Sequence, residues 1–200
     1  CEKFSRQIIV RKQVCVNETL ADLLVDGKIV ARCAGPMEFG ARALGNRSIL
    51  ASPGDLRVVR KINQAIKKRD FWMPFAPAIL AEEADSVLEI PKTLENNLSP
   101  YMMFTFRVKM EMVDQIIAGV HQADGTARAQ IVDKILYPDL HDVISRFFDK
   151  TGNPVVLNTS FNLHGLPIVN NASDAIDVFL SSELDALIID DWLITRSGSG

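Results

Sequence analysis

Two hundred residues are enough to bury one sizeable hydrophobic core, so the chain is expected to form a single domain. Its 22 lysines and arginines nearly balance 25 aspartates and glutamates, which argues against a nucleic-acid-binding protein that relies on high positive charge. The sequence contains no apolar run long enough to cross a membrane, and its three cysteines lack the CxxC spacing of zinc sites, so we predict a cytoplasmic protein.

The first part of the chain is expected to contain a short helix and a buried strand. Asn17 can cap a helix over residues 19–25, and the mainly apolar stretch 28–34 is typical of a buried strand. Cys15 and Cys33 are expected to lie in the core as small apolar residues. The strand leads directly into a glycine-rich loop.

This loop, residues 35–50, is named the glycine–arginine loop because it carries three glycines and two arginines. The glycines can adopt positive φ angles or bring backbone N–H groups close to a ligand. Arg42 and Arg47 carry planar donors that suit phosphate or carboxylate. A glycine-punctuated turn with solvated arginines explains the pattern about as well, and Glu38 is expected to bond a loop N–H or an arginine.

A helix and then a basic pair follow. Apolar residues from Leu56 to Ile66 recur at helical spacing, and the helix is expected to end by about residue 66. Lys67 and Arg69 would then share one side of an extended chain, because alternate residues of a strand face the same way. The alternative is a basic helix C-terminus that stabilises the helix dipole. A strand is expected over residues 76–81.

Two further polar pairs occur in the second half of the chain. After a turn at Asp124, Thr126 and Arg128 are expected to share one face of a strand with two alanines on the other face. This pattern favours a binding surface, although a solvated edge strand explains it nearly as well. Ser160 and Asn162 lie two positions apart after a predicted buried strand.

The remaining elements of the second half are predicted from apolar spacing and turn residues. A helix is expected to begin at Asp139 or His141 and to end at Thr151. The buried strand is expected over residues 154–158. The last elements are expected to be a helix capped by Ser173 and strands over 186–189 and 192–195.

Four blocks of the sequence resemble the C-terminal domain of the nodulation-type carbamoyltransferases, enzymes that carbamoylate nodulation factors and some antibiotics. In chain order they are Glu38–Leu50, Ile66–Leu80, His121–Gln130 and Asn158–Val169. The resemblance spans nearly the whole chain and implies a YrdC-like α/β fold, with a twisted mixed sheet and flanking helices. It implies one domain over residues 1–196, followed by a linker or tail at 197–200.

The pairs Lys67/Arg69 and Ser160/Asn162 also resemble the Lys/Arg/Ser/Asn set of YrdC-like domains, which make carbamoylated adenylates from ATP. By this resemblance, carbamoyl phosphate and ATP would yield a carbamoyl adenylate with Mg²⁺ as cofactor. A Kae1-like transfer domain, normally in the same polypeptide, would pass the carbamoyl group to an acceptor hydroxyl. Fixed cations and polar donors suit such a reaction, because negative charge accumulates on phosphate oxygens in its transition state.

The resemblance assigns roles to ten residues and no metal ligand. The expected catalytic residues are Lys67, Arg69, Ser160 and Asn162. The expected substrate- and cofactor-binding residues are Arg42, Arg47, Thr126, Arg128, Asn158 and Thr159.

One departure from the family pattern leaves other functions open. An acidic residue usually follows the glycine of the last block, whereas Leu166 follows Gly165 here. This difference favours a nucleotide-binding regulatory module without turnover. A YrdC-like RNA-binding module is a further alternative, against which the acidic charge balance argues. The three histidines, His121, His141 and His164, lack metal-ligand spacing. The sequence contains no GxxxxGK[ST] motif, so any ATP would be bound without a P-loop.

Overall fold

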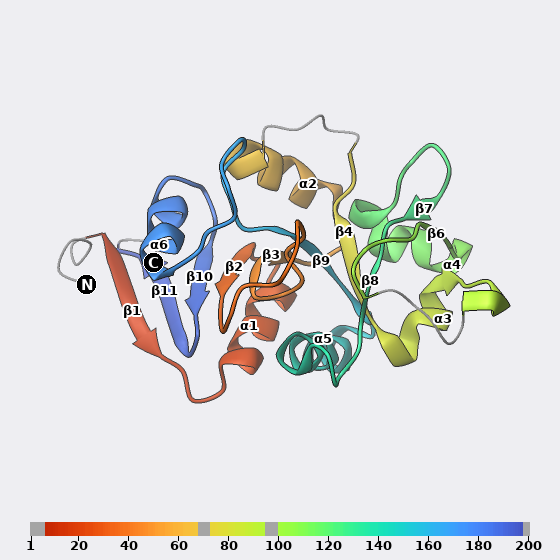
Figure 1. Ribbon diagram of the computed structural model, residues 1–200, viewed down its shortest axis with the longest axis horizontal. Coiled ribbons are helices and arrows are strands. Elements are labelled where there is room, and N and C mark those ends of the chain that lie inside the picture. The colour runs from red at the N-terminus through yellow and green to blue at the C-terminus, as the bar shows by residue number, and fades with distance from the viewer. Residues whose placement is uncertain (1–6, 68–72, 95–99, 198–200) are drawn as a thin grey trace.

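The computed structural model describes residues 7–67, 73–94 and 100–197, which form two β-sheets surrounded by helices (Figure 1). The large sheet has eight strands in the order β1-β11-β10-β2-β3-β9-β4-β8. Their bounds are β1 Ile8–Lys12, β2 Val30–Cys33, β3 Arg47–Ala51, β4 Ala76–Leu80, β8 Gln130–Val132, β9 Val155–Ser160, β10 Ala186–Ile189 and β11 Trp192–Arg196. The small sheet has the order β5-β6-β7, formed by β5 Leu88–Glu89, β6 Phe106–Val108 and β7 Thr126–Ala127.

Helices cover both faces of the large sheet and one end of the molecule. The α-helices of the described residues are α1 Val16–Val25, α2 Leu56–Ile62, α3 Ala84–Val87, α4 Met110–Val113, α5 Pro138–Thr151 and α6 Ala172–Leu180. Shorter turns are the π-helical η2 Asn63–Lys67 and the 3₁₀-helical η3 Ala81–Glu83, η4 Lys92–Leu94 and η5 Asp114–Gly119. Within the described part of the chain, no helix is both long enough and apolar enough to span a membrane.

The large sheet is mixed. Strand β10 pairs parallel with β2, and β4 pairs parallel with β8, while the other neighbouring strands pair antiparallel. The expected α/β fold with a mixed sheet and flanking helices is therefore confirmed.

Alternation along the central strands produces two hydrophobic cores. In β9, Val156 faces α1 and α5, whereas Leu157 faces the opposite side, where α2 and α6 pack. Phe147 of α5 and Phe179 of α6 are fully buried against these two faces. A third cluster joins the small sheet to the edge of the large one around Ile79. The inner strands are thus covered on both faces, which holds their ends rigidly.

The start of α1 differs from the prediction. The helix begins at Val16, three residues earlier than expected, and Asn17 does not cap it but donates from Nδ2 to Asp142 Oδ2 at 3.0 Å. Cys15 is therefore an exposed N-cap residue, and its predicted place in the core is wrong. Cys33 is buried in β2 as predicted, and burial raises the pKa of its thiol.

Several other predicted boundaries move because tertiary pairing decides them. Thr126 and Arg128 do not share one strand, since β7 ends at Ala127 and the chain joins the large sheet only at β8. Strand β9 continues through Ser160, two residues beyond the predicted end, because β3 pairs with it. The last helix is capped by the side chain of Asn171, which accepts from Asp174 N at 3.0 Å, and not by Ser173.

Candidate functional site

Glu38 organises the glycine–arginine loop from inside. Its Oε1 accepts hydrogen bonds from the backbone N–H of Leu44 at 2.7 Å and of Asn46 at 2.6 Å. Gly45 has a φ of +130°, and a Cβ there would lie 3.0 Å from Cδ2 of Leu140. The expectation that Glu38 bonds a loop N–H is confirmed. Glu38 thus braces the loop internally, and the missing side chain of Gly45 allows its backbone to approach Leu140 of α5 closely.

The two arginines of this loop have different surroundings. Arg47 is buried, and its terminal nitrogens donate at 2.9–3.2 Å to four carbonyl oxygens, those of Ala34, Gly35, Asn46 and Asn170. Arg42 is exposed and lines a pocket. The predicted anion-binding role therefore suits Arg42 better than Arg47, which fastens the loop to its neighbours.

Residues from distant parts of the chain surround a small hollow of about 60 Å³, which we name the inner pocket. Its described lining consists of Ala41, Arg42, Ala43, Pro74, Phe75, Ala76, Met102, Arg128, Asn158, Thr159 and Ser160. Five predicted site residues meet here, including both Arg42 and Arg128. Strand β9 positions three of them at its C-terminal end, where its pairing with β3 and β4 fixes the backbone.

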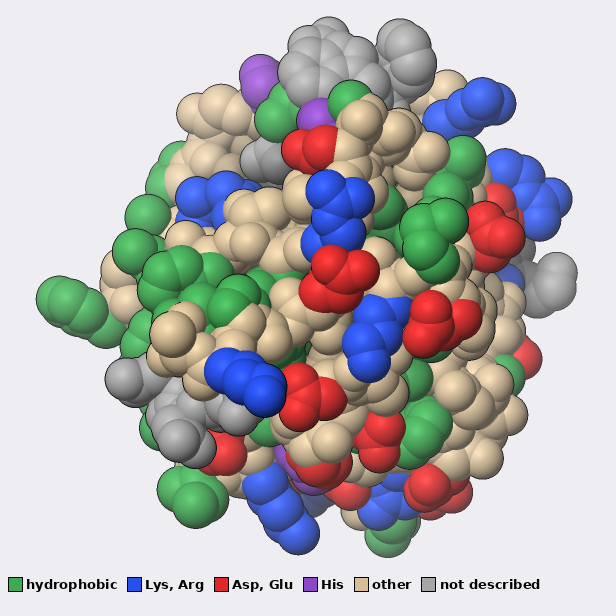
Figure 2. All heavy atoms as spheres, turned by 90° about the vertical axis from the view of Figure 1, so that its right-hand side faces the viewer, with side chains coloured by type: hydrophobic (Ala, Val, Ile, Leu, Met, Phe, Trp, Pro, Cys, Tyr) green, Lys and Arg blue, Asp and Glu red, His purple; other side chains and the backbone are tan. Residues whose placement is uncertain are grey.

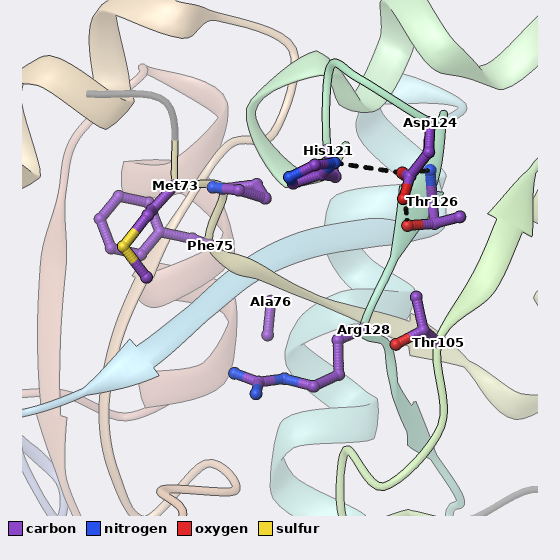
Figure 3. Close-up of a pocket in the computed structure, with 10 residues that line it drawn as sticks. Met73, Phe75, Ala76, Thr105, His121, Asp124, Thr126 and Arg128 are labelled. Carbon is purple, nitrogen blue, oxygen red and sulfur yellow. Dashed lines mark hydrogen bonds and ion pairs between the residues drawn. The ribbon is translucent and has the colours of Figure 1, made fainter. Parts of the chain in front are cut away.

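A larger hollow of about 390 Å³, the outer pocket, adjoins the inner one (Figure 3). The two share four lining residues, which are Pro74, Phe75, Ala76 and Arg128. In Figure 3 the guanidinium of Arg128 extends past Ala76, while His121, Asp124 and Thr126 lie together at the other end of the pocket. Arg128 thus links the two hollows, and Thr126 borders only the outer one.

A hydrogen-bonded cluster forms one end of the outer pocket. Asp124 Oδ1 accepts from Thr126 Oγ1 at 2.7 Å and from Thr126 N at 3.0 Å, and His121 Nδ1 lies 3.2 Å from it. The hydroxyl bond from Thr126 is the largest cause that holds the pKa of Asp124 below its usual value. The sequence analysis did not single out His121 or Asp124 as site residues. Their place in the third family-like block was the available signal.

The predicted Ser160/Asn162 pair is connected directly. Ser160 Oγ donates to Asn162 Oδ1 at 2.7 Å, and Asn162 Nδ2 donates to the carbonyl oxygen of Leu166 at 2.7 Å. Ser160 lines the inner pocket, whereas Asn162 is not among the pocket's described lining residues. Leu166 therefore contributes its backbone to this arrangement, while its side chain is exposed.

Gln130 is a buried polar residue that the sequence analysis missed. Its Nε2 donates to the carbonyl oxygen of Leu44 at 2.9 Å, and its Oε1 accepts from Asn158 Nδ2 at 2.6 Å. Asn158 Nδ2 also donates to the carbonyl oxygen of Ala43 at 3.2 Å. The two amides thus tie the glycine–arginine loop to the large sheet.

The predicted basic pair falls at the edge of the described chain. Lys67 is the last residue of η2, and its side chain, like the whole of Arg69, lies outside the described residues. The helix is expected to end by about residue 66; in the described chain α2 ends at Ile62, and the π-helical η2 continues to Lys67, one residue past that expectation. Such turns are frequent at functional sites. Joint binding by Lys67 and Arg69 stays a prediction.

The expected Mg²⁺ can be tested against the pocket chemistry. Within the described residues, no group of three or more histidine, cysteine or acidic side chains is placed to hold a metal ion. Asp124 is the one carboxylate among the described lining residues of the two pockets. Mg²⁺ commonly binds one or two carboxylates together with substrate phosphates and waters. Asp124 is therefore the described lining residue that could contact a magnesium ion brought in with substrate phosphates.

Two arginines and polar strand-end residues line the inner pocket of this mixed α/β domain, and guanidinium groups are chemically suited to bind phosphate or carboxylate. The family described as Carbamoyltransferase C-terminus matches residues 21–196, and the chain belongs to this family. Nodulation protein NolO of Bradyrhizobium diazoefficiens is 37% identical over 193 residues, which cover 96% of this chain and 35% of NolO. A 3′-hydroxymethylcephem-O-carbamoyltransferase of Streptomyces clavuligerus is 32% identical over 184 residues, covering 92% of this chain and 34% of that enzyme.

The chain thus spans about a third of the length of these relatives. Among solved structures, full-length HypF in the phosphate- and nucleotide-bound form has a TM-score of 0.65 at 16% identity, over 92% of this chain and 26% of HypF. A variant of P. abyssi Sua5 has a TM-score of 0.58 at 20% identity, over 88% of this chain and 48% of Sua5. These likenesses confirm the expected YrdC-like fold.

Proposed function

We propose that this chain is the carbamoyl-adenylate-forming domain of an O-carbamoyltransferase and that it uses carbamoyl phosphate and ATP. The observation that carries the proposal is the convergence of Arg42 and Arg128 on the inner pocket from segments far apart in the sequence. Among the described lining residues of that pocket there is no carboxylate to repel an anion. The family membership supports the same chemistry.

The atoms of the proposed reaction balance in two steps. Water cleaves carbamoyl phosphate into carbamate and inorganic phosphate. A carbamate oxygen then attacks the α-phosphorus of ATP, the bond from that phosphorus to the bridging β-oxygen breaks, and pyrophosphate leaves. Both steps place additional negative charge on phosphate oxygens, so cations held in fixed positions lower their barriers.

The residues of the inner pocket are suited to that task. Arg42 and Arg128 would bind phosphate oxygens with paired N–H donors, and each such donor group is typically worth about 3 kcal/mol in a transition state. Thr159 and Ser160 supply hydroxyl groups beside them at the end of β9. Mg²⁺, when bound with ATP, would neutralise further phosphate charge. The pairing of β9 with β3 and β4 positions the hydroxyl groups of Thr159 and Ser160 before the ligand arrives, which limits reorganisation during the reaction.

Transfer of the carbamoyl group is proposed to take place elsewhere in a longer polypeptide. The relatives are about three times as long as the matched segment, and one of them has O-carbamoyltransferase in its name. A Kae1-like domain would receive the adenylate and would bind the acceptor hydroxyl. This chain would then supply the activated intermediate.

Two alternative functions are a regulatory module and an RNA-binding module. A regulatory module would bind ATP without turnover, consistent with Leu166 in place of the usual acidic residue. An RNA-binding module would need a continuous basic surface. Figure 2 instead shows acidic and basic side chains interspersed on the end of the molecule that carries the small sheet. A salt-dependent RNA-binding assay distinguishes this alternative, because phosphate contacts weaken steeply with salt.

The decisive experiment measures pyrophosphate release from ATP and Mg²⁺ with and without carbamoyl phosphate. The wild-type chain is compared with a Lys67→Ala, Arg69→Ala double variant. An Arg57→Ala, Arg60→Ala double variant serves as the control, since it removes two exposed cations that line neither pocket. We expect release only with carbamoyl phosphate, and its loss only in the first variant. ATP binding without release would favour the regulatory module, and absence of nucleotide binding would contradict the proposal.

A further inference from the structure

The side-chain amide of Asn158 has one orientation imposed by backbone groups. Its Nδ2 donates to the carbonyl oxygen of Ala43, which can only accept, so this atom must be the amide nitrogen. The neighbouring Gln130 is oriented in the same way by its bond to the carbonyl oxygen of Leu44, which directs Gln130 Oε1 toward Asn158. The two backbone carbonyl groups therefore determine the orientation of both side-chain amides, and Asn158 Oδ1 must point away from them.

This oxygen is an unused acceptor in a buried place. Asn158 is 1% exposed, and its Oδ1 has no hydrogen-bond partner among the described residues. Most buried polar atoms are hydrogen-bonded, and an unsatisfied one costs free energy, so an exception calls for an explanation. Asn158 lies in the lining of the inner pocket with Arg42 and Arg128. A ligand bound there would supply the missing donor.

The space beside Asn158 results from a small residue on the next strand. Ala76 of β4 is the antiparallel partner of Asn158, and cross-strand partners project from the same face. The single methyl group of Ala76 leaves room that a larger side chain would fill. Arg128 lines the same pocket, and its guanidinium lies near Ala76 in Figure 3. One ligand could therefore place an anionic group on an arginine and an N–H donor on Asn158 at the same time.

We propose that Asn158 Oδ1 accepts a hydrogen bond from the amino group of the carbamoyl moiety and so selects carbamoyl phosphate over acyl phosphates. In acetyl phosphate a methyl group of similar size replaces that amino group and leaves the acceptor unsatisfied. The inference rests on the proposed function and names the group that recognises its substrate. A site with a buried unpaired polar group rejects the analogue that lacks the matching partner.

Two stable analogues test the inference by binding alone. Phosphonoacetamide carries the amide, and acetonylphosphonate carries a methyl ketone in its place. Isothermal titration of the 200-residue chain should show about a tenfold to hundredfold preference for the amide, as expected when a buried acceptor loses its donor. This comparison needs no variant, so it remains informative even if substitutions at the buried site prevent folding.

Two variants separate recognition from a purely structural role. Asn158→Leu should bind both analogues with nearly equal affinity. Gln130→Leu removes the other amide of the network but leaves the acceptor of Asn158 in place, so it should keep the preference. Equal loss of preference in the two variants, or retention of the preference in Asn158→Leu, would assign Asn158 to holding the loop only.

The outcomes also distinguish this inference from the proposed function. If the wild-type chain binds both analogues equally, the selection by Asn158 is wrong and the proposed function is untouched. If neither analogue nor inorganic phosphate binds, the anion site itself is wrong, and both proposals fall. A clear preference for the amide supports both.

Discussion

The inner pocket and a second polar hollow of the same molecule contrast sharply in charge. The second hollow, which we name the acidic pocket, measures about 360 Å³ and includes the starts of α1 and α5 in its lining. Its charged lining comprises five carboxylates and two arginines, which are Glu18, Asp139, Asp142, Asp190, Asp191, Arg32 and Arg146. The inner pocket is smaller, yet its described lining contains two arginines and no carboxylate. Volume alone therefore does not identify an anion site.

Arg32, the buried arginine of the acidic pocket, has its donors engaged by groups of the protein itself. Arg32 Nη1 donates to the carbonyl oxygen of Gly45 at 2.7 Å and to Asn46 Oδ1 at 3.2 Å, while Nη2 donates to Asp139 Oδ2 at 3.2 Å. Burial lowers the pKa of Arg32, and the nearby Asp139 partly opposes this shift. Its donors already serve the glycine–arginine loop. The same loop thus uses one arginine for support on one side and presents Arg42 to a pocket on the other.

The largest expected effect is the loss of phosphate affinity in Arg128→Ala. Removal of a cation from the link between the two pockets should weaken binding of inorganic phosphate roughly 10- to 100-fold, because hydrogen bonds to charged groups contribute about 1.5–3 kcal/mol. Titration calorimetry measures this change, with Arg60→Ala as a control that keeps wild-type affinity. Comparable affinity in Arg128→Ala and wild type would end the distinction between the two hollows.

Gly45→Ala should cause the largest loss of stability. A Cβ at this positive φ would lie 3.0 Å from Cδ2 of Leu140, so strain and crowding together should lower the free energy of unfolding by about 3 kcal/mol. Gly152→Ala is the matched control, because Gly152 also has a positive φ but open space around its missing Cβ. It should lose only about 1 kcal/mol. Equal losses in denaturant unfolding would show that packing against α5 contributes nothing.

Arg32→Met should destabilise the fold more than it weakens anion binding. The change leaves the carbonyl oxygen of Gly45 without its donor and should lower the free energy of unfolding by about 2 kcal/mol. Arg146→Met removes a partly exposed arginine of the same pocket, whose solvent-screened pairing with Asp142 should contribute much less to stability. Chemical unfolding and phosphate titration are measured on both variants. A larger effect on affinity than on stability in Arg32→Met would place an anion site in the acidic pocket.

The smallest predicted effect is a pH dependence at the outer pocket. Because the folded pKa of Asp124 lies below its ordinary value of 3.8, its contribution to stability is present above that pH and is lost as pH falls through the folded pKa. Thr126→Val removes the hydroxyl bond that is the main cause. The pKa of Asp124 should then rise toward its ordinary value, as followed by NMR titration of its carboxyl carbon. An unchanged midpoint would show that the hydroxyl does not bind the carboxylate in solution.

Features that depend on neighbouring residues were predictable. Asp55 immediately precedes α2 and caps it by accepting from Arg57 N, and Gly152 ends α5 with a φ of +71°. Glu38 bonds the loop N–H groups because it belongs to the same loop. Tertiary contacts overrode local patterns elsewhere, as where the chain leaves the small sheet after Ala127 and joins the large sheet at Gln130.

Within the site, the sequence indicated which segments carry the polar residues but not which role each residue has. Arg42 and Arg47 are five positions apart in one motif and are chemically identical. Their roles differ because Arg47 donates to carbonyl groups of both halves of the chain, including that of Asn170, while Arg42 lines the inner pocket. Gln130 could not be recognised as a site residue because its partner Asn158 is remote in the sequence.

By itself, the sequence determined the α/β class, the glycine–arginine loop, the family resemblance and most elements, because alternation, capping and turn chemistry act over a few residues. Only the tertiary structure decided which arginine is buried, which cysteine is exposed and which way the amide of Asn158 points. Burial and hydrogen-bond partners depend on segments that meet only after folding. The unsatisfied acceptor of Asn158, on which substrate selection is proposed to rest, exists only because the carbonyl oxygen of Ala43 and Oε1 of Gln130 occupy the donor side of its amide.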